Sequence, residues 1–342
     1  MGHVKIVHAV LLCGIAGLTG AWGPRGHQNA NRAAVRALPA DVPVFLREYE
    51  DWIAKTGPLP DSWRLVSEPY SRIFEDPNHG WFKEQFAFMT AIPRSRYEFV
   101  LRLYDEYLRI REKDPERAAL TNVRWTGTLP YAAMENYDRM KSAMRLYRRS
   151  IADSSAESQK DARFLAQDIA FYMGWMGHYT ADGAQPLHDT IHHDGWQGPN
   201  PKGYTTDARI HGRFESSFVD LIQLTDSDLA PLMEKPKLLP DPFASILAHL
   251  DEASTHVEEL YALDKAGAFA DKSSEPAARL ARSQLAKAAA LLRDLTDTAW
   301  AESGKPAAPV GTEGNPTSRN HPRYDPQTGT APPGPAVPRK NP

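Results

Sequence analysis

The chain has 342 residues, of which 42% are hydrophobic and 24% charged, and its formal net charge is −3. A chain of this length and composition folds into one or two globular domains with a sizeable core. A net charge this close to zero provides no general attraction to a nucleic-acid duplex or a membrane surface, and it excludes proteins that bind such partners by bulk charge.

Residues 1–21 have the layout of a secretory signal peptide. Lys5 precedes an apolar run, and small residues follow it up to Ala21. The apolar run is too short to cross a bilayer. We therefore predict cleavage between Ala21 and Trp22 and an exported protein, either periplasmic or secreted. A buried N-terminal helix is the alternative interpretation, and no transmembrane segment is predicted elsewhere.

Cys13 is the only cysteine and lies within the predicted signal peptide. The predicted mature chain therefore has no thiol. Disulfides, thiolate metal ligands and cysteine nucleophiles are excluded, so any metal ion would be held by nitrogen and oxygen.

Helical periodicity dominates residues 22–302, and almost nothing alternates like a strand. The predicted helices cover residues 25–38, 43–54, 95–110, 131–147, 161–183, 208–224, 244–263 and 276–300. The residues that share one face of the 95–110 helix are Tyr97, Val100, Leu101, Tyr104 and Leu108. The fold class predicted is all-α, a single domain of roughly eight to ten helices.

The composition changes over residues 303–342, which contain ten prolines and few large apolar side chains. This segment has five basic and two acidic residues. A polar, proline-rich composition predicts a disordered tail.

The segment 177–188 reads G-H-Y-T-A-D-G-A-Q-P-L-H and carries the strongest functional signal. His178 and Asp182 stand four residues apart, so both leave the same face of a helix. Pro186 ends that helix and turns the chain back, which offers His188. Imidazole and carboxylate are ligands that zinc prefers, although a solvated face would show the same spacing.

A second pair with helical spacing, His211 and Glu215, follows in I-H-G-R-F-E. Together with His188 from the turn, these residues would close a second metal site. Two such pairs on either side of one histidine are much less frequent by chance than one pair.

The predicted mature N-terminus reads W-G-P-R-G-H and places His27 five residues after Trp22. An α-amine has an unperturbed pKa of about 8, so it becomes a neutral nitrogen donor at little cost near neutral pH. Signal cleavage would then complete a metal site. The alternative is that Trp22 is an ordinary first residue and His27 decorates a helix.

Other histidines and aromatic residues have plainer interpretations. His192 and His193 are interpreted as solvated residues of the loop 189–207, with contact to substrate as the alternative. Trp81 and Phe82 are interpreted as core residues, and stacking on a base or contact with an acyl chain is the alternative. The sequence has no phosphate-binding loop, no serine-hydrolase motif and no dinucleotide fingerprint.

Five separated motifs together resemble one family. They are W-G-x-x-G-H, D-x-W-R, D-P-N-H, G-H-Y-x-x-D-x-x-Q-P-L-H and I-H-x-x-F-E, in this order. The chain is similar over residues 22 to 225 to the zinc-dependent phospholipase C and single-strand nuclease superfamily. Its spacings resemble mostly the nuclease branch, named for the fungal S-one and P-one enzymes.

The resemblance implies an α-helical fold around a trinuclear zinc site. Transferred residue by residue, the ligands of the first zinc ion are Asp61, His79, His178 and Asp182; those of the second are His188, His211 and Glu215; and those of the third are His27 with the amine and carbonyl of Trp22. Asp182 would bridge the first and third ions. Asp76 is an alternative to Asp61 because it lies closer to His79 in sequence, but Trp63-Arg64 after Asp61 favours Asp61.

The chain also departs from the nuclease pattern. The fungal nucleases contain disulfides, which this mature chain lacks. Gly80-Trp81-Phe82 follows His79 where nucleases place an aromatic residue and a carboxylate that bind a base. Glu215 matches the phospholipases, whereas the short interval from Trp22 to His27 matches the nucleases.

The expected activity is hydrolysis of phosphoester bonds in single-stranded nucleic acid or nucleotides by a zinc-bound hydroxide, which Asp61 orients. A zinc-dependent phospholipase C that acts on phospholipid head groups is the alternative. A non-catalytic exported protein stabilised by zinc is a third possibility. No obligate protein partner is inferred.

Overall fold

The computed structural model describes residues 22–306 together with Arg319 and Tyr324. Among these residues the regular structure is helical, and the one extended pairing is an isolated bridge between Trp81 and Gly127. The all-α prediction is confirmed. The predicted signal peptide and most of the predicted tail lie outside the described residues.

All eight predicted helical segments are present, and short helices connect them. The helices of the first half are α1 (Gly23–Arg36), α2 (Phe45–Glu48), α3 (Glu50–Thr56), α4 (Leu59–Ser62), α5 (Pro69–Glu75), η1 (Asp76–His79), η2 (Lys83–Phe86), α6 (Arg96–Ile110), α7 (Pro115–Leu120), α8 (Val123–Thr126) and α9 (Leu129–Ala152). Those of the second half are α10 (Ala156–Asp182), η3 (Pro186–Asp189), α11 (Ile210–Gly212), η4 (Arg213–Phe218), α12 (Val219–Leu221), α13 (Asp226–Leu229), η5 (Ala230–Leu232), α14 (Pro242–Ser254), α15 (Val257–Lys265), η6 (Ala268–Ala270) and α16 (Glu275–Ser303). None of the helices in the described part of the chain has the length and hydrophobicity needed to cross a membrane.

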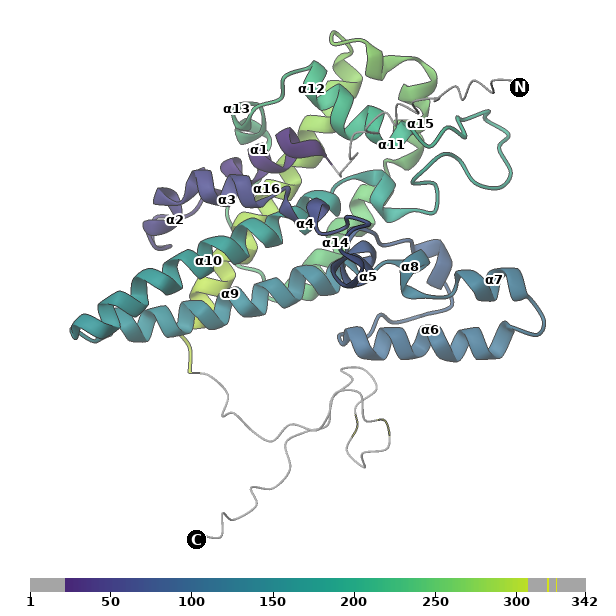
Figure 1. The fold of residues 1–342 in the computed structure, drawn as a ribbon. Helices are drawn as coiled ribbons and strands as arrows, with labels where there is room; N and C mark the ends of the chain where they lie inside the picture. The colour runs from purple at the N-terminus through teal and green to yellow at the C-terminus, as the bar shows by residue number, and fades with distance from the viewer. Residues whose placement is uncertain (1–21, 307–318, 320–323, 325–342) are drawn as a thin grey trace, which may run out of the picture.

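Helix α10 is central to the bundle. It lies beside α9 as a long pair and also packs against α1, α3 and α16 (Figure 1). The side-chain amide of Asn31 on α1 donates to the carbonyls of Ile53 and Gly174, at 2.9 and 3.1 Å, and so joins three helices. A Cβ at Gly177 would lie 2.0 Å from Oδ1 of Asn31, so glycine lets α1 approach α10 closely just before His178.

Two predicted helices are interrupted. The segment 43–54 is divided at Tyr49 into α2 and α3, and the segment 244–263 is divided after Thr255 into α14 and α15. The Thr255 hydroxyl donates to the carbonyl of Glu252 at 2.7 Å, a local bond that competes with helix continuation. The segment 208–224 contains a π-helical turn, η4.

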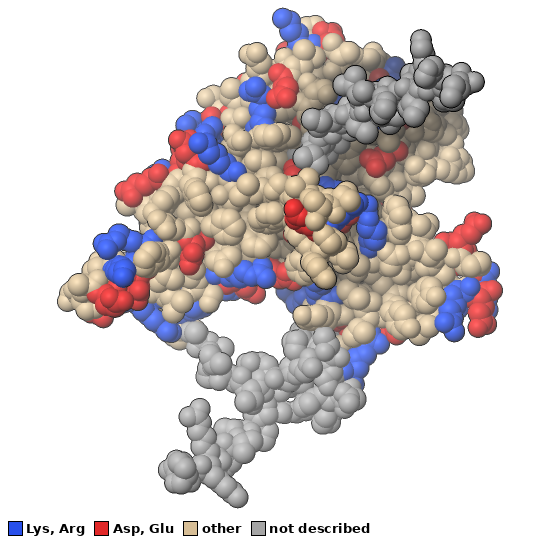
Figure 2. All heavy atoms as spheres, viewed as in Figure 1, with Lys and Arg blue, Asp and Glu red and all other residues tan. Residues whose placement is uncertain are grey.

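Helices α5 to α8 form a lobe beside the bundle, and α6 and α7 extend away from it (Figure 1). The buried face of α6 carries Phe99, Leu103 and Ile110. In the view of Figure 2, uncharged side chains cover much of this lobe, and acidic and basic side chains gather together at its far end, near α7. Helices α5 to α8 are called the α5–α8 lobe below.

Candidate metal centre

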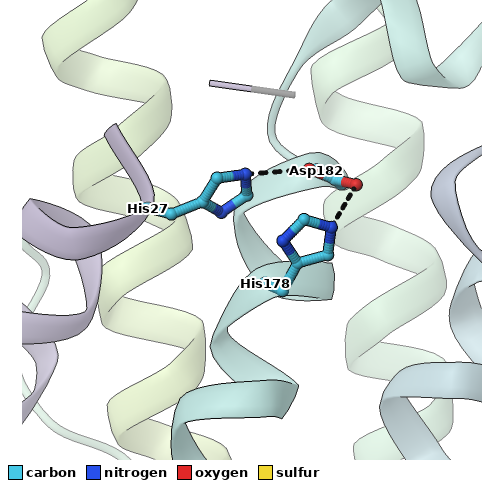
Figure 3. Close-up of side chains that lie close together, drawn as sticks. All are labelled: His27, His178 and Asp182. Carbon is cyan, nitrogen blue, oxygen red and sulfur yellow. Dashed lines mark ion pairs between the residues drawn. The ribbon is translucent and has the colours of Figure 1, made fainter. Parts of the chain in front are cut away.

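The end of α10 meets the start of α1 at a group of three buried side chains. His178 and Asp182 leave the same face of α10, and His27 reaches them from α1 (Figure 3). Nε2 of His178 lies 3.2 Å from Oδ2 of Asp182, and Nε2 of His27 lies 3.5 Å from Oδ1. The ring of His27 stacks on that of His178 at 4.2 Å. Asp182 therefore directs one oxygen toward each histidine, the arrangement expected of a bridging carboxylate.

A second group joins α4, η1 and α10. Asp61, His79 and His178 each offer a ligand atom within 4.8 Å of the others. Nδ1 of His79 lies 3.0 Å from Oδ2 of Asp182 and 3.8 Å from Oδ1 of Asp61. Asp182 thus adjoins this group as well, as the four-residue ligand set requires.

Asp76 has a different environment from Asp61. Its carboxylate lies 2.9 Å from Arg64, 3.3 Å from Arg72 and 3.7 Å from Arg124. Burial opposes ionisation, but the contacts with Arg64 lower the pKa of Asp76. Asp76 is therefore paired with cations, whereas Asp61 faces the histidines.

The third group contains His188, His211 and Glu215. Nε2 of His211 lies 3.0 Å from Nε2 of His188 and 3.0 Å from Oε2 of Glu215. Pro186 begins the short helix η3 that presents His188, as the sequence predicts. Gln185, the first residue of Q-P-L-H, donates to Glu215 at 2.9 Å and fixes the carboxylate.

Close backbone pairing holds the second and third groups together. The amide of Trp81 donates to the carbonyl of His188 at 2.8 Å, and Trp81 also pairs with Gly127. A Cβ at Gly127 would lie 1.8 Å from the carbonyl oxygen of Gly80, and its φ is +77°, so only glycine fits. The segment after His79 is therefore fixed against η3.

Backbone carbonyls orient three of the histidine rings. Nδ1 of His178 faces the carbonyl of Gly57 at 2.9 Å, and Nδ1 of His211 faces that of His193 at 3.0 Å. Nδ1 of His188 faces the carbonyl of His79. Because a carbonyl oxygen only accepts, each Nδ1 carries a proton, and Nε2 is the ring atom that could bind a metal ion.

The groups consequently direct ring nitrogens and carboxylate oxygens toward one another. Nε2 of His188 lies 3.0 Å from Nε2 of His211, and Nε2 of His178 lies 3.0 Å from Nδ1 of His79. Buried carboxylate oxygens without a hydrogen bond among the described residues complete the groups: Oδ1 of Asp61, Oδ1 of Asp182 and Oε1 of Glu215. Buried acceptors without donors are costly, and a cation removes that cost. The donor set fits metal ions held by nitrogen and oxygen.

Protons and metal ions compete for these lone pairs. Burial lowers the pKa of His178, but Asp182 and Asp61 outweigh burial and raise it to about 9. Burial also lowers the pKa of His211, but the negative charges of Glu215 and Asp194 outweigh burial and raise it to about 10. Burial raises the pKa of Glu215, yet His211 and His188 lower it to about 2. Glu215 therefore stays charged, and a metal ion held by these side chains would displace the imidazole protons.

Sequence reasoning missed two carboxylates that contact the histidines. Oε1 of Glu75 lies 3.4 Å from Nε2 of His79 and accepts from the Tyr179 hydroxyl. Oδ1 of Asp194 lies 3.3 Å from Nδ1 of His211. Carboxylates in these positions orient a ligating imidazole and increase its basicity. The four-residue spacing from Glu75 to His79 is a helical signal that could have identified the first.

A cleft of about 590 Å³ opens over the second and third groups. Its lining includes His79, His188 and His211, the cations Arg64, Arg124, Arg209 and Arg213, and the aromatic rings of Phe82 and His193. The ring of His193 stacks on that of Phe82 at 4.6 Å and an interplanar angle of 9°. The interpretation of His193 as a solvated loop residue is therefore wrong, because the loop folds back over the cleft.

Trp22 is fully buried beside the first group. Its indole N–H donates to the carbonyl of Ala181 at 2.7 Å, which attaches the start of α1 to the residue before Asp182. Trp22 has a positive φ of 44°. The metal-binding amine and carbonyl of Trp22 stay predictions.

Neither the protein-family models nor the curated proteins with which the chain was compared give a match.

Proposed function

We propose that the chain is an exported zinc-dependent phosphoesterase with three zinc ions. The first ion would be held by Asp61, His79, His178 and Asp182, the second by His188, His211 and Glu215, and the third by His27, Asp182 and the amine and carbonyl of Trp22. The observation that carries this proposal is the convergence of buried acceptors from helices far apart in the sequence. A purely structural core gains nothing from lone pairs that face one another.

When bound, zinc supplies Lewis-acid chemistry: it lowers the pKa of water and offsets negative charge on a phosphoryl group. The side chains of the chain supply the rest. Burial raises the pKa of Asp61 more than His178 and His79 lower it, so Asp61 is a stronger base than an ordinary aspartate. Its carboxylate lies 3.8 Å from Nδ1 of His79, a residue of the cleft wall, and suits a role in accepting a proton from the attacking water.

Two arginines are placed to bind the substrate phosphate. Arg64 lies 3.7 Å from Asp61, and both Arg64 and Arg124 line the cleft. Asp76 holds both guanidinium groups and leaves donors on each for a ligand. A planar guanidinium binds phosphate oxygens in pairs, which would orient the ester for in-line attack.

We infer that the substrate is a single-stranded nucleic acid or a nucleotide. The stacked rings of Phe82 and His193 provide an aromatic wall beside these arginines. Bases stack on such walls while cations bind the phosphates. This wall would replace the aromatic-carboxylate pair that the sequence lacks after His79.

A phospholipid is the second candidate substrate, and one observation favours it. An apolar groove of about 530 Å³ shares Asp76, Pro77 and Arg124 with the cleft. Its walls include Val66, Ile73 and Val123, and Ile73 is 76% exposed. An acyl chain could lie there while its phosphate occupies the cleft.

The test is to produce the chain beginning at Trp22, measure zinc per chain, and assay single-stranded DNA, RNA and phosphatidylcholine in parallel. Loss of activity with a chelator and recovery with zinc are expected. Fewer than two zinc ions per chain would contradict the trinuclear centre. Hydrolysis of lipid but not of nucleic acid would make phospholipid the first candidate substrate. Bound zinc without hydrolysis of any phosphoester would indicate that the zinc ions have a structural role.

One extra residue before Trp22 tests the third ion separately. A chain that begins Met-Trp22 should bind one zinc ion fewer and lose activity, because the amine would be displaced. Full activity and full zinc content in that chain would show that the amine is not a ligand.

A further inference from the structure

Helix α6 has apolar side chains on two of its faces. Phe99, Leu103 and Ile110 are buried against the lobe. The stripe predicted from the sequence lies outside instead, with Tyr97 and Tyr104 both 55% exposed and Leu108 42% exposed. A solvent-facing stripe of large apolar residues indicates an interaction surface for another segment or molecule.

An acidic pair borders this stripe and already has a partner in the chain. Asp105 lies 2.7 Å from Arg319, and Glu98 lies 3.3 Å from the same guanidinium. The Tyr324 hydroxyl donates to Glu98 as well. Glu98 is only 3% exposed despite its place on a surface helix. Two residues from the predicted tail thus contact α6 more than 200 positions away in sequence.

Helical geometry connects the acidic pair with the apolar stripe. Glu98 and Asp105 are seven residues apart and share a face, and Leu101 lies between them at the third and fourth positions. Tyr97 and Tyr104 each precede an acidic residue by one position. A chain that contacts Glu98 and Asp105 therefore passes beside exposed tyrosines.

The segment that carries Arg319 and Tyr324 has the composition to occupy this surface. Pro316, Pro322 and Pro326 lie close to these two residues in sequence. Proline-rich segments bind exposed aromatic residues with little loss of conformational entropy. The fifteen residues between Ser303, where α16 ends, and Arg319 reach roughly 50 Å when extended, which is ample for the connection.

We propose that α6 is the docking surface for the C-terminal segment of its own chain, centred on Arg319 and Tyr324. Arg319 forms an ion pair with both acidic residues, and the Tyr324 hydroxyl donates to Glu98. This surface is separate from the metal centre and does not depend on the proposed phosphoesterase activity.

Crosslinking in the full chain tests the docking, since Cys13 is the only native cysteine. In a Cys13→Ser background, Tyr104→Cys with Ser318→Cys keeps the Asp105–Arg319 ion pair and should react with a short bismaleimide to give an internally crosslinked monomer. Asp51→Cys with Ser318→Cys is the matched control, because Asp51 is an exposed carboxylate on α3 with a side chain 78% exposed. Equal crosslinking of both pairs, or a crosslinked dimer in place of the monomer, would overturn the proposal.

Trypsin provides a measurement that does not alter Arg319. Asp105→Lys removes the ion pair and should speed cleavage after Arg319 about two- to fivefold, the range that an exposed ion pair supports. Asp51→Lys should leave the cleavage rate unchanged. Identical cleavage rates in the two variants would show that Arg319 is not held at α6.

Discussion

The metal centre and the α5–α8 lobe differ in how fully their side chains are satisfied. At the metal centre, His27, His178 and Asp182 are completely buried, and their polar atoms converge on shared points. In the lobe, Tyr70 is 91% exposed and Ile73 76% exposed. The buried groups of the centre could hold a cation inside the chain, whereas the lobe leaves apolar side chains at the solvent.

The largest effect is expected when the carboxylate of Asp182, which two of the groups share, is removed. Asp182→Asn should release more than one metal ion per chain and lower hydrolysis of bis-p-nitrophenyl phosphate at least about 100-fold, since Asp182 adjoins two groups. Asp61→Asn should cost one ion at most. Metal analysis by mass spectrometry and initial rates measure both.

Asp138→Asn is the matched control for these variants, because Asp138 is an exposed aspartate on α9 with a side chain 65% exposed. It should retain metal and activity. Equal and mild effects of Asp182→Asn and Asp61→Asn would contradict a bridging role for Asp182.

A smaller effect is expected where a carboxylate acts through a histidine. Glu75→Gln keeps the shape of the side chain but removes the charge beside His79 and Tyr179. Metal affinity should fall about 10- to 100-fold, the range for partners that orient a ligating imidazole. Competition with a chromogenic chelator measures this, with exposed Glu116→Gln as control. An unchanged affinity would show that Glu75 serves packing alone.

The pKa shifts give a pH dependence for the metal-free protein. His178 and His211 have folded-state pKa values raised to about 9 and about 10 from an ordinary value of 6.5. A raised pKa contributes stability below the unfolded value of about 6.5, and that contribution is lost as the pH rises through 9 to 10. Metal-free protein should therefore lose stability between pH 7 and 10.

Calorimetry of metal-free wild type and His211→Asn isolates this contribution. The fall in Tm between pH 7 and 10 should be smaller in the variant by several degrees, because each 1 kcal/mol shifts Tm by roughly 2–4 °C in a protein of this size. Parallel pH profiles for the two proteins would refute the assignment.

The lobe should give the smallest effects on folding. Tyr70→Ser should change the free energy of unfolding by no more than about 0.5 kcal/mol and leave the metal content intact, because an exposed side chain loses few contacts. The Tyr70→Ser variant is then compared with the wild type on lipid vesicles and on soluble diesters. A selective loss of activity on phosphatidylcholine vesicles, with soluble diesters unaffected, would sharpen the case for lipid as substrate.

Local spacing explains what the sequence could predict. His178 and Asp182 share a helix, and Pro186 sets the turn to His188, so their grouping needs only helix geometry. The pairing of His79 with Asp182 spans 103 residues and followed only from the family resemblance.

The rest depends on tertiary packing that local periodicity does not contain. The periodicity of α6 predicts that Tyr97, Val100 and Tyr104 share one face, and these residues are exposed in the structure. The sequence pattern of one helix does not determine which of its faces other elements cover. The fold of the loop that brings His193 onto Phe82 likewise carries no spacing signal. The interruption at Thr255 arises from a hydroxyl that bonds its own helix.

His79 contacts two of the three candidate metal-binding groups, one through its ring and one through its backbone carbonyl. The ring of His79 faces Asp182, while its carbonyl orients the ring of His188 in the neighbouring group. An ion that fixes the His79 ring would also fix the carbonyl that holds His188 ready for the next ion. Metal uptake by this chain should therefore be cooperative, with a titration steeper than independent sites allow.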